Sequence, residues 1–519
     1  MFNKKRRPEY WLKRLGIILA LVIAALMLSA CQVYDGYPTT TPEPTAPPTN
    51  TVIAAVTARP TLPPAPTLPP RPTLPPAPAN VQLQKADIMK KGFDALLNNY
   101  FLKLDSADSY EVGLRSIQSA LESAGVQNPQ VPIPDFSGQP DANWKTFLQA
   151  FTIIFDKYKS QVSEDTLEQV ALAGAASALQ DCQTSYIPAS VAEEYYQIRT
   201  GQQSIIGIGI NLQSGTANGR NVHFVTRPIA GGPAVQAGIQ NGDQILAVDG
   251  KDVSTLTSTD VVKLIQGTSS NTGTSAAGSK VVLTVAHPGS NQSQDITITR
   301  ASIQLPNIER QTINGNIGYI HFNRFPLTNQ NDLDTASKNL GTWLQDFSKA
   351  GVKGLVLDLR GNSYGSIAMV QNYLSYFIDK QDLVYLTGVR IDQNNTPRYG
   401  SFPVPRYDTV QANTTLPVSV IVDGSTSGEA EIFAYALQQD KRATIVGDTT
   451  NGCLSASRPI PLDDNSLMNI TSYRAISDVA KPDSLVQNVV PDQKAPVDLQ
   501  QLSQGKDNQL DAAIQALNK

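Results

Sequence analysis

The sequence is poor in the residues that most often form metal sites, with three histidines and three cysteines in 519 residues. Neither a CxxC motif nor a Cys/His spacing typical of structural zinc is present. Positive charge is not in excess either, because the chain has 41 lysines and arginines and 45 aspartates and glutamates. Such a balance offers no basic surface for nucleic acid. We therefore expect no cofactor, no metal and no nucleic-acid partner, in a chain long enough for two or three domains.

The N-terminus carries an apolar run of 16 residues, 15–30, which follows the basic residues 1–14 and precedes Cys31. That order is typical of a secretory signal sequence. Residues 28–31, LSAC, resemble the bacterial lipobox, which implies cleavage before Cys31 and a diacylglyceryl group on its sulfur. The alternative is a single membrane-spanning anchor, for which 16 residues are short. In both cases we expect the rest of the chain outside the cytoplasm, anchored to the bacterial cell membrane.

Proline is concentrated between residues 37 and 80, which contain the repeats TLPPAP, TLPPRP and TLPPAP. Proline-rich chain favours the extended polyproline II conformation. We interpret residues 32–80, which follow the signal segment 1–31, as a stalk between the membrane and the folded part. A docking site for a proline-reading module is the alternative.

The patterns beyond the stalk predict a multidomain α/β protein. Apolar residues at i, i+3, i+4 and i+7 predict a helical N-terminal domain over 81–199. Short alternating runs predict a β-rich domain with two short helices over 200–300. Strands that alternate with amphipathic helices predict an α/β core over 301–503, followed by a C-terminal helix over 504–519.

The β-rich domain resembles a PDZ domain, on the segment GPAVQAGIQNGDQILAVDGKDV from Gly232. The resemblance implies a groove beside a loop that contains Gly207, Ile208, Gly209 and Ile210. Backbone N–H groups of such a loop capture the C-terminal carboxylate of a peptide, which adds to the sheet as a strand. We therefore expect peptide or protein C-terminal tails as partners, with an idle or self-occupied groove as the alternative.

The α/β core resembles the C-terminal processing (tail-specific) serine proteases. Five stretches carry the resemblance: IGYIHFNRF from Ile317, GLVLDLRGN from Gly354, SVIVDGSTSGEAEIFAYALQ from Ser419, KRATIVGDTTNG from Lys441 and VVPD from Val489. It covers roughly residues 85–500 and implies a core of the crotonase/Clp-protease type.

Two positions that carry the chemistry in this family differ here. In its best-known branch a serine is the nucleophile, and a lysine whose pKa is lowered by burial takes the serine proton. Laid on that pattern without gaps, the sequence has Gly428 at the serine position and Cys453 at the lysine position. A Ser–Lys dyad therefore cannot form at the family positions.

The other expected catalytic groups are also replaced. A second branch, resembling tricorn-type proteases, takes a histidine base from the helical domain, and Gln183 stands at the matching position. An amide does not accept a proton near neutral pH. His321, the one histidine of the core, is interpreted as structural. For the oxyanion site the family has a Gly-Gly pair, whereas this sequence has Tyr364 and Gly365, so a tyrosine side chain would narrow the pocket floor.

Ser427 is the remaining candidate nucleophile. It lies one place before Gly428, at the expected start of a helix, where N–H groups and the helix dipole favour negative charge. A shift of the turn by one residue would bring its hydroxyl to the nucleophile's place. Alternatively, Thr426 and Glu429 form a Thr-x-x-Glu capping box that only starts the helix.

The resemblance also implies that Cys182 and Cys453 converge on the active site, because the first adjoins the histidine position and the second occupies the lysine position. Outside the cytoplasm two adjacent thiols can form a disulfide, which would tie the helical domain to the core. The alternative is two separate small buried residues.

Two functions follow from these residues. The first is a membrane-anchored member of the family that binds C-terminal tails but has lost most or all peptidase activity. The second is an active serine endopeptidase that cuts tails with Ser427 and a base that the family does not use. The replacements at Gly428, Cys453 and Gln183 favour the first.

Overall fold

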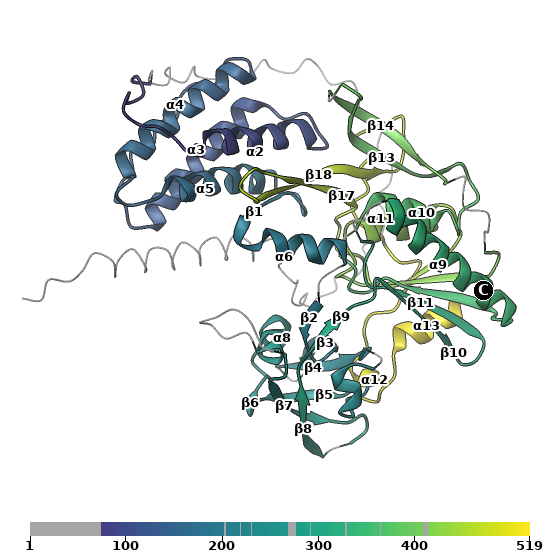
Figure 1. Ribbon diagram of the computed structural model, residues 1–519. Helices are drawn as coiled ribbons and strands as arrows, with labels where there is room; N and C mark the ends of the chain where they lie inside the picture. Colours follow the sequence, from purple (N-terminus) through teal and green to yellow (C-terminus); the bar gives the residue numbers. More distant parts are fainter. Residues whose placement is uncertain are drawn as a thin grey trace, which may run out of the picture.

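The computed structural model describes most of the chain beyond the proline-rich segment (Figure 1). The described residues are 74–201, 204–217, 219–229, 231–267, 277–290, 292–326, 330–363, 365–394, 396–407 and 414–518. The expected signal sequence, Cys31 and Tyr364 lie outside them, as does nearly all of the expected stalk. Among the helices in the described ranges, none combines the length and the apolar character needed to cross a membrane.

The N-terminal part is a bundle of helices with one short strand. Its elements are α2 (Ala86–Asn99), α3 (Ser106–Ser123), α4 (Pro140–Tyr158), α5 (Glu164–Ser177), β1 (Ser185–Ile187) and α6 (Ala189–Thr200). Aromatic side chains fill its centre, where the rings of Phe93 and Phe147 meet edge to face with centroids 5.0 Å apart. The Ser163 hydroxyl caps α5 by accepting a hydrogen bond from the backbone N–H of Thr166 at 3.0 Å.

A PDZ-like domain lies below the bundle in Figure 1. Its elements are β2 (Ser204–Gly207), β3 (Asn211–Ala217), β4 (Arg220–Thr226), α7 (Pro233–Gln236), β5 (Gln244–Val248), β6 (Lys251–Asp252), α8 (Ser258–Gln266), β7 (Lys280–Ala286), β8 (Ser293–Thr299) and β9 (Ala301–Gln304). The main sheet has the order β3-β4-β5-β7-β8, and β2 pairs with β9 where the chain enters and leaves the domain. Strand β3 is an edge strand, and α8 packs against it.

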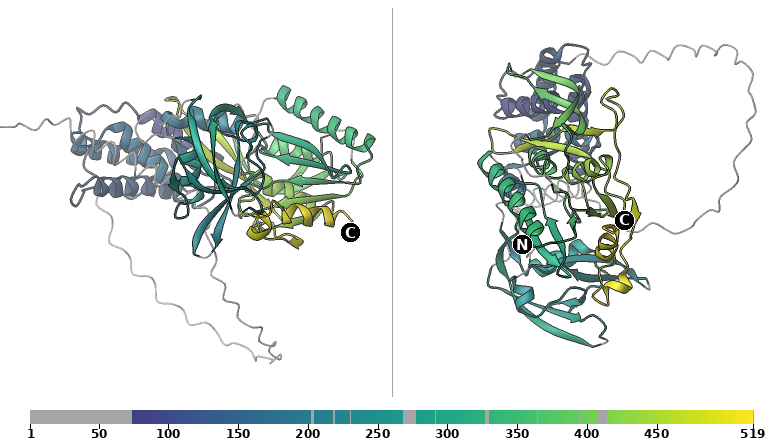
Figure 2. Two further views of the ribbon diagram at one scale, coloured as in Figure 1. Left: turned by 90° about the horizontal axis from the view of Figure 1, so that it is seen from below. Right: turned by 90° about the vertical axis from the view of Figure 1, so that its right-hand side faces the viewer.

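The α/β core is built on the sheet β10-β11-β12-β15-β16-β19. Its strands and helices are β10 (Ile308–Ile313), β11 (Ile317–Phe322), α9 (Gln330–Lys349), β12 (Gly354–Asp358), α10 (Ile367–Leu374), β15 (Val418–Val422), α11 (Glu429–Gln439), β16 (Thr444–Gly447), β19 (Gln493–Lys494), α12 (Leu499–Leu502) and α13 (Asn508–Ala516). Every residue of β11, β12 and β15 is buried, as expected for parallel strands covered on both faces. Helix α13 covers one face and α9 lies on the other (Figure 2).

A second sheet joins the helical bundle to the core. It contains β13 (Asp382–Ile391), β14 (Pro397–Pro405), β17 (Ser455–Pro461) and β18 (Leu467–Ile476), and β1 pairs with β18. The hairpin of β17 and β18 reaches the bundle, where Met468 and Ile470 enter its hydrophobic core (Figure 1). Because β1 lies beside this hairpin, the residues just before it, 181–184, are brought next to the start of β17. The expected multidomain α/β fold class is confirmed.

Candidate functional site

The Ser/Thr/Gly-rich turn follows the central strand β15 and leads into α11. The Asp423 carboxylate holds the turn by accepting hydrogen bonds from the backbone N–H groups of Ser425 and Thr426 at 3.0 and 2.9 Å. The Thr426 hydroxyl donates to the carbonyl of Leu359 at 3.1 Å. Next, the Ser427 N–H donates to the carbonyl of Asn362 at 2.9 Å. The turn is therefore fixed against the loop that follows β12.

The start of α11 differs from the expected capping box. The helix begins at Glu429 with Gly428 as its N-cap, and Thr426 is not the capping residue. The Thr426 hydroxyl is used inside the turn, where it also accepts from the Asp423 N–H at 3.0 Å. The Glu431 carboxylate instead accepts a hydrogen bond from the Gly428 N–H at 3.2 Å. The Thr426–Glu429 capping box was a wrong prediction, because bonds within the turn compete for the threonine hydroxyl.

Gly428 has a backbone conformation that side chains rarely adopt, with φ 64° and ψ −130°. A Cβ atom built on it would lie 2.5 Å from the side-chain nitrogen of Gln183 and 3.4 Å from the Ser363 carbonyl oxygen. The space that a residue with a side chain would need at position 428 is therefore taken by the amide of Gln183.

Gln183 is held in this place from several sides. Its side-chain Nε2 donates to the Ser455 carbonyl at 3.2 Å, and its backbone N–H donates to Asp181 Oδ1 at 2.8 Å. Its own carbonyl accepts from the Asn469 side chain on β18 at 2.6 Å. Gln183 is thus a fixed neighbour of Gly428, and it comes from the helical bundle.

A disulfide joins Cys182 to Cys453, with Cα atoms 5.9 Å apart. It connects the segment before β1 with the loop before β17, so both cysteines lie beside the turn at Gly428. The Glu431 carboxylate holds this loop as well, since it accepts from the N–H groups of Gly452 and Cys453 at 2.8 and 2.7 Å. A lysine base is absent here, because position 453 is a cysteine whose sulfur is bonded to Cys182.

A buried ion pair, which sequence reasoning missed, lies next to Gly428 at the first turn of α11. Glu429 is fully buried, 4.0 Å from the guanidinium of Arg199 on α6. Arg199 also donates to the Gly365 carbonyl at 3.1 Å and to the Ser457 hydroxyl at 3.2 Å. The glutamates of α11 could have been noticed as charges within an apolar helix, but nothing in the sequence marks Arg199 as their neighbour.

In the described part of the chain, the Ser427 hydroxyl has no hydrogen-bonded base. Its side chain is partly buried, and among the described residues none exchanges a hydrogen bond with its hydroxyl. A general base needs to lie within about 3.2 Å of the proton's oxygen, or one water away. Among the described residues, Ser427 therefore lacks a base bonded directly to its hydroxyl.

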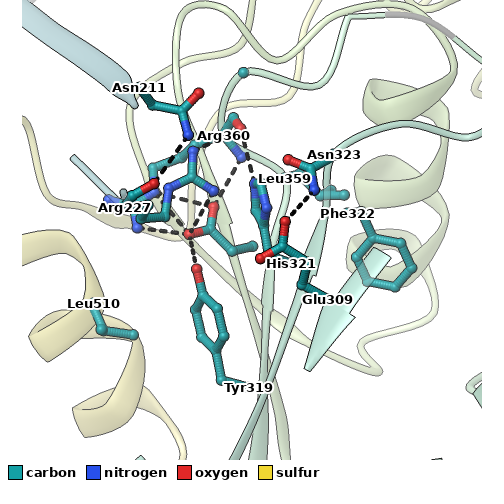
Figure 3. Close-up of polar contacts among 12 residues, drawn as sticks. Asn211, Arg227, Glu309, Tyr319, His321, Phe322, Asn323, Leu359, Arg360 and Leu510 are labelled. Atoms are coloured by element: carbon teal, nitrogen blue, oxygen red, sulfur yellow. Dashed lines mark hydrogen bonds and ion pairs between the residues drawn. The ribbon is translucent and has the colours of Figure 1, made fainter. Parts of the chain in front are cut away.

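His321 belongs to a polar cluster at the seam between the core and the PDZ-like domain (Figure 3). In this cluster the Asp358 carboxylate accepts hydrogen bonds from the Tyr319 hydroxyl at 2.7 Å and from the Arg360 guanidinium at 2.6 Å. The guanidinium of Arg227, just after β4, lies 3.9 Å from the same carboxylate. Burial, then the charge of Arg227, lowers the pKa of His321 to about 4. The imidazole is neutral at pH 7 and contacts the Arg360 carbonyl at 3.4 Å, which fits a structural role.

For the expected oxyanion site, the structure describes Gly365 but not Tyr364. A Cβ on Gly365 would lie 2.8 Å from Cβ of Phe325 and 2.9 Å from Cβ of Glu429. This position accepts only glycine, and its carbonyl is bonded to Arg199. No side chain other than hydrogen fits between the turn and the loop here.

The expected carboxylate loop of the PDZ-like domain lies between β2 and β3. The carbonyls of Ile208 and Gly209 accept hydrogen bonds from the N–H groups of Ala234 and Ile229, both at 2.9 Å. In contrast, no described residue accepts a hydrogen bond from the N–H groups of Ile208, Gly209 or Ile210. Three consecutive N–H groups are thus unpaired among the described residues, as in a loop that captures a carboxylate.

The buried glutamates predict that the folded protein is more stable at mildly acidic pH than at alkaline pH. Burial raises the pKa of Glu429 and of Glu431 to about 7, from 4.5. Each side chain holds its proton more tightly when folded, so this contribution to stability falls as pH rises from about 4.5 to 7. We expect a lower thermal midpoint at pH 8 than at pH 5.5, and a smaller difference in Glu429→Gln. The exposed Glu122→Gln is the control, and an unchanged difference in Glu429→Gln would contradict the assignment.

With this geometry established, two family models match the chain. Residues 316–495 match Peptidase family S41, and residues 197–285 match the PDZ domain. The α/β core therefore resembles Peptidase family S41, and the domain before it resembles a PDZ domain.

Named relatives and a solved structure are similar to this chain over much of its length. The chain is 24% identical over 385 residues to the carboxy-terminal processing protease CtpB of Bacillus subtilis, covering 73% of this chain and 74% of the relative. It is 28% identical over 331 residues to the carboxy-terminal-processing protease of Bartonella bacilliformis, covering 63% and 70%. Among solved structures, the photosystem II D1 C-terminal processing protease is 22% identical, with a TM-score of 0.39, covering 75% of this chain and 93% of that one.

Proposed function

We propose that this protein is a membrane-anchored member of the C-terminal processing peptidases that binds C-terminal tails and no longer cleaves them. The observation that carries the proposal is the side chain of Gln183, whose nitrogen lies 2.5 Å from where a Cβ at Gly428 would stand. The resemblance to the family places the nucleophile at this position. The nucleophile is absent there, and a side chain at position 428 would require the Gln183 amide to move.

Two further features support the loss of chemistry. Peptide hydrolysis by a serine needs a base that removes the hydroxyl proton and donors for the oxyanion. The expected lysine position is occupied by a disulfide, and the expected histidine position is occupied by Gln183, which contacts Gly428. Ser427 has a hydroxyl, but no described residue accepts a hydrogen bond from it.

Tail binding rests on the free donors of the PDZ loop. A C-terminal carboxylate would accept hydrogen bonds from the N–H groups of Ile208, Gly209 and Ile210, and the peptide would pair with the edge strand β3. Helix α8 forms the other side of this groove, since it packs against β3.

A charge placed next to this loop is expected to weaken tail binding. A Cβ on Gly207 would meet nothing within 4 Å, so the position accepts a side chain. Gly207→Asp should weaken binding of a peptide with an apolar C-terminus at least about tenfold, because like charges repel. Fluorescence anisotropy with the full chain in detergent measures this, with Gly207→Ala as the matched control. Equal affinity for the free-acid and amidated peptides would refute carboxylate capture.

The alternative function is an active endopeptidase that uses Ser427. It is favoured by one observation, the partly buried hydroxyl at the N-terminus of α11, where helix N–H groups favour negative charge. The two functions differ in whether Ser427→Ala changes cleavage of a bound tail.

The membrane attachment rests on the sequence alone, on the basic and apolar residues that precede Cys31. We propose that a lipid on the Cys31 sulfur holds the protein at the outer face of the cytoplasmic membrane, with the proline-rich segment as a stalk. Cys31→Ser should move the protein from the membrane fraction to the soluble fraction if signal cleavage still occurs in the variant. Labelling with a radioactive fatty acid that persists in Cys31→Ser would contradict the assignment.

A further inference from the structure

Three carboxylates come together where the helical bundle meets the β17–β18 hairpin. Asp165 and Glu168 lie in the first turns of α5, and Asp464 lies in the loop of the hairpin. One oxygen from each lies within 4.8 Å of the others. They come from parts of the chain about 300 residues apart, so only the folded protein assembles them.

Glu168 is the unusual member of this cluster. Its side chain is completely buried, and neither of its carboxylate oxygens has a hydrogen-bond partner among the described residues. Burying an ionised carboxylate without a partner is costly, so such a group either takes up a proton or binds a cation.

One ammonium group faces the cluster. The Lys85 Nζ lies 2.9 Å from Asp165 Oδ1 and 3.5 Å from Asp464 Oδ2. The second oxygen of Asp464 accepts hydrogen bonds from the backbone N–H and hydroxyl of Ser466 at 3.1 and 2.6 Å. Among the described residues, Lys85 is therefore the cation paired with two of these three acidic side chains, and it lies near Oδ2 of Asp464.

The oxygen spacing is compatible with a calcium ion bound between the three side chains. Calcium takes oxygen ligands at about 2.3–2.6 Å, so two ligands on opposite sides of the ion lie about 5 Å apart. Carboxylates suit this hard cation, whereas zinc prefers nitrogen and sulfur ligands. We propose that Asp165, Glu168 and Asp464 bind a divalent cation of the calcium class, and that the Lys85 ammonium is the competing group that the cation displaces. Bound there, the ion fastens α5 to the hairpin.

The proposal predicts opposite effects for two substitutions. Lys85→Met removes the competing charge and should bind Ca²⁺ at least about tenfold more tightly, because an ammonium beside carboxylates repels the incoming cation. Glu168→Gln keeps the shape of the side chain, removes its charge and should weaken binding at least about tenfold. A purely structural ion pair with Lys85 does not predict a gain in calcium affinity.

Calorimetric titration of CaCl₂ into the full chain, purified in detergent and freed of metal with EDTA, tests the proposal. We expect one site per chain and a calcium-dependent rise in the thermal midpoint, both kept in the control Asp156→Asn. Asp156 is a bundle carboxylate that pairs with Lys159. If Lys85→Met folds only when CaCl₂ is present, that also supports the site.

Three results would overturn it. The first is no heat and no midpoint shift in either the unmodified chain or Lys85→Met up to about 10 mM CaCl₂, above the weakest range of extracellular calcium modules. The second is equal binding by Glu168→Gln and Asp156→Asn. The third is tighter binding of Mg²⁺ than of Ca²⁺, which would contradict the calcium class.

Discussion

Replacing Cys182 and Cys453 together by alanine is expected to lower the free energy of unfolding by about 3–5 kcal/mol. The disulfide joins residues 271 positions apart, so it closes a long loop and restricts the unfolded chain strongly. It also fastens the segment with Gln183 to the core, beside Gly428. Urea unfolding of the full chain, with and without the substitutions, measures the difference.

Reduction provides the control for this prediction. A reductant should shift the urea midpoint of the unmodified chain toward that of the double variant and leave the double variant unchanged. Intact mass after alkylation should show two blocked thiols, at Cys182 and Cys453, only when a reductant is added first. Two thiols that alkylate in the folded protein without reductant would contradict the bond.

Gly428→Ala is expected to destabilise the protein by about 2–4 kcal/mol. Part of the cost, about 1–3 kcal/mol, comes from a side chain in the conformation with φ 64° and ψ −130°. The rest, about 1 kcal/mol, comes from displacing the Gln183 amide from its hydrogen bond to the Ser455 carbonyl. Denaturant unfolding measures the change.

Gly424→Ala is the matched control in the same turn. A Cβ on Gly424 would have its nearest neighbour, the Thr449 carbonyl oxygen, at 4.0 Å, so its substitution should cost much less. In the double variant Gly428→Ala/Gln183→Ala the shorter side chain at 183 leaves room for the added Cβ. Its loss of unfolding free energy should therefore be smaller than the sum of the losses in the two single variants. Equal effects of Gly424→Ala and Gly428→Ala would contradict the account of the turn.

The strands and helices of this protein could be predicted from the sequence more fully than the contacts among its buried polar residues. Strands such as β12 and β15 are continuous apolar runs, and their burial follows directly from that pattern. The PDZ and core segments were recognisable because they resemble known families. The pairing of β1 with β18, which brings Gln183 to Gly428, has no local signal, since it joins chain segments about 280 residues apart.

Competition between hydrogen bonds explains why the predicted capping box at Thr426 does not form. Thr426 has a hydroxyl and a glutamate three residues later, so the sequence predicts a capping box. In the fold the same hydroxyl reaches the Leu359 carbonyl, and Glu431 reaches back to Gly428 instead. Which of these bonds forms depends on the loop after β12. The buried pair of Arg199 and Glu429 likewise depends on how α6 packs on the core.

Cleavage of a bound tail tests the central claim most directly, namely that the turn at Gly428 carries out no peptide hydrolysis. The measurement is mass spectrometry of an unstructured protein with an apolar C-terminus after incubation with the full chain, with Ser427→Ala and with Ser425→Ala. Ser425 is an exposed serine of the same turn, bonded to Asp423 at 2.7 Å. We predict no product above the enzyme-free control for any of the three. Product formed by the unmodified chain and Ser425→Ala, but abolished in Ser427→Ala, would contradict the account.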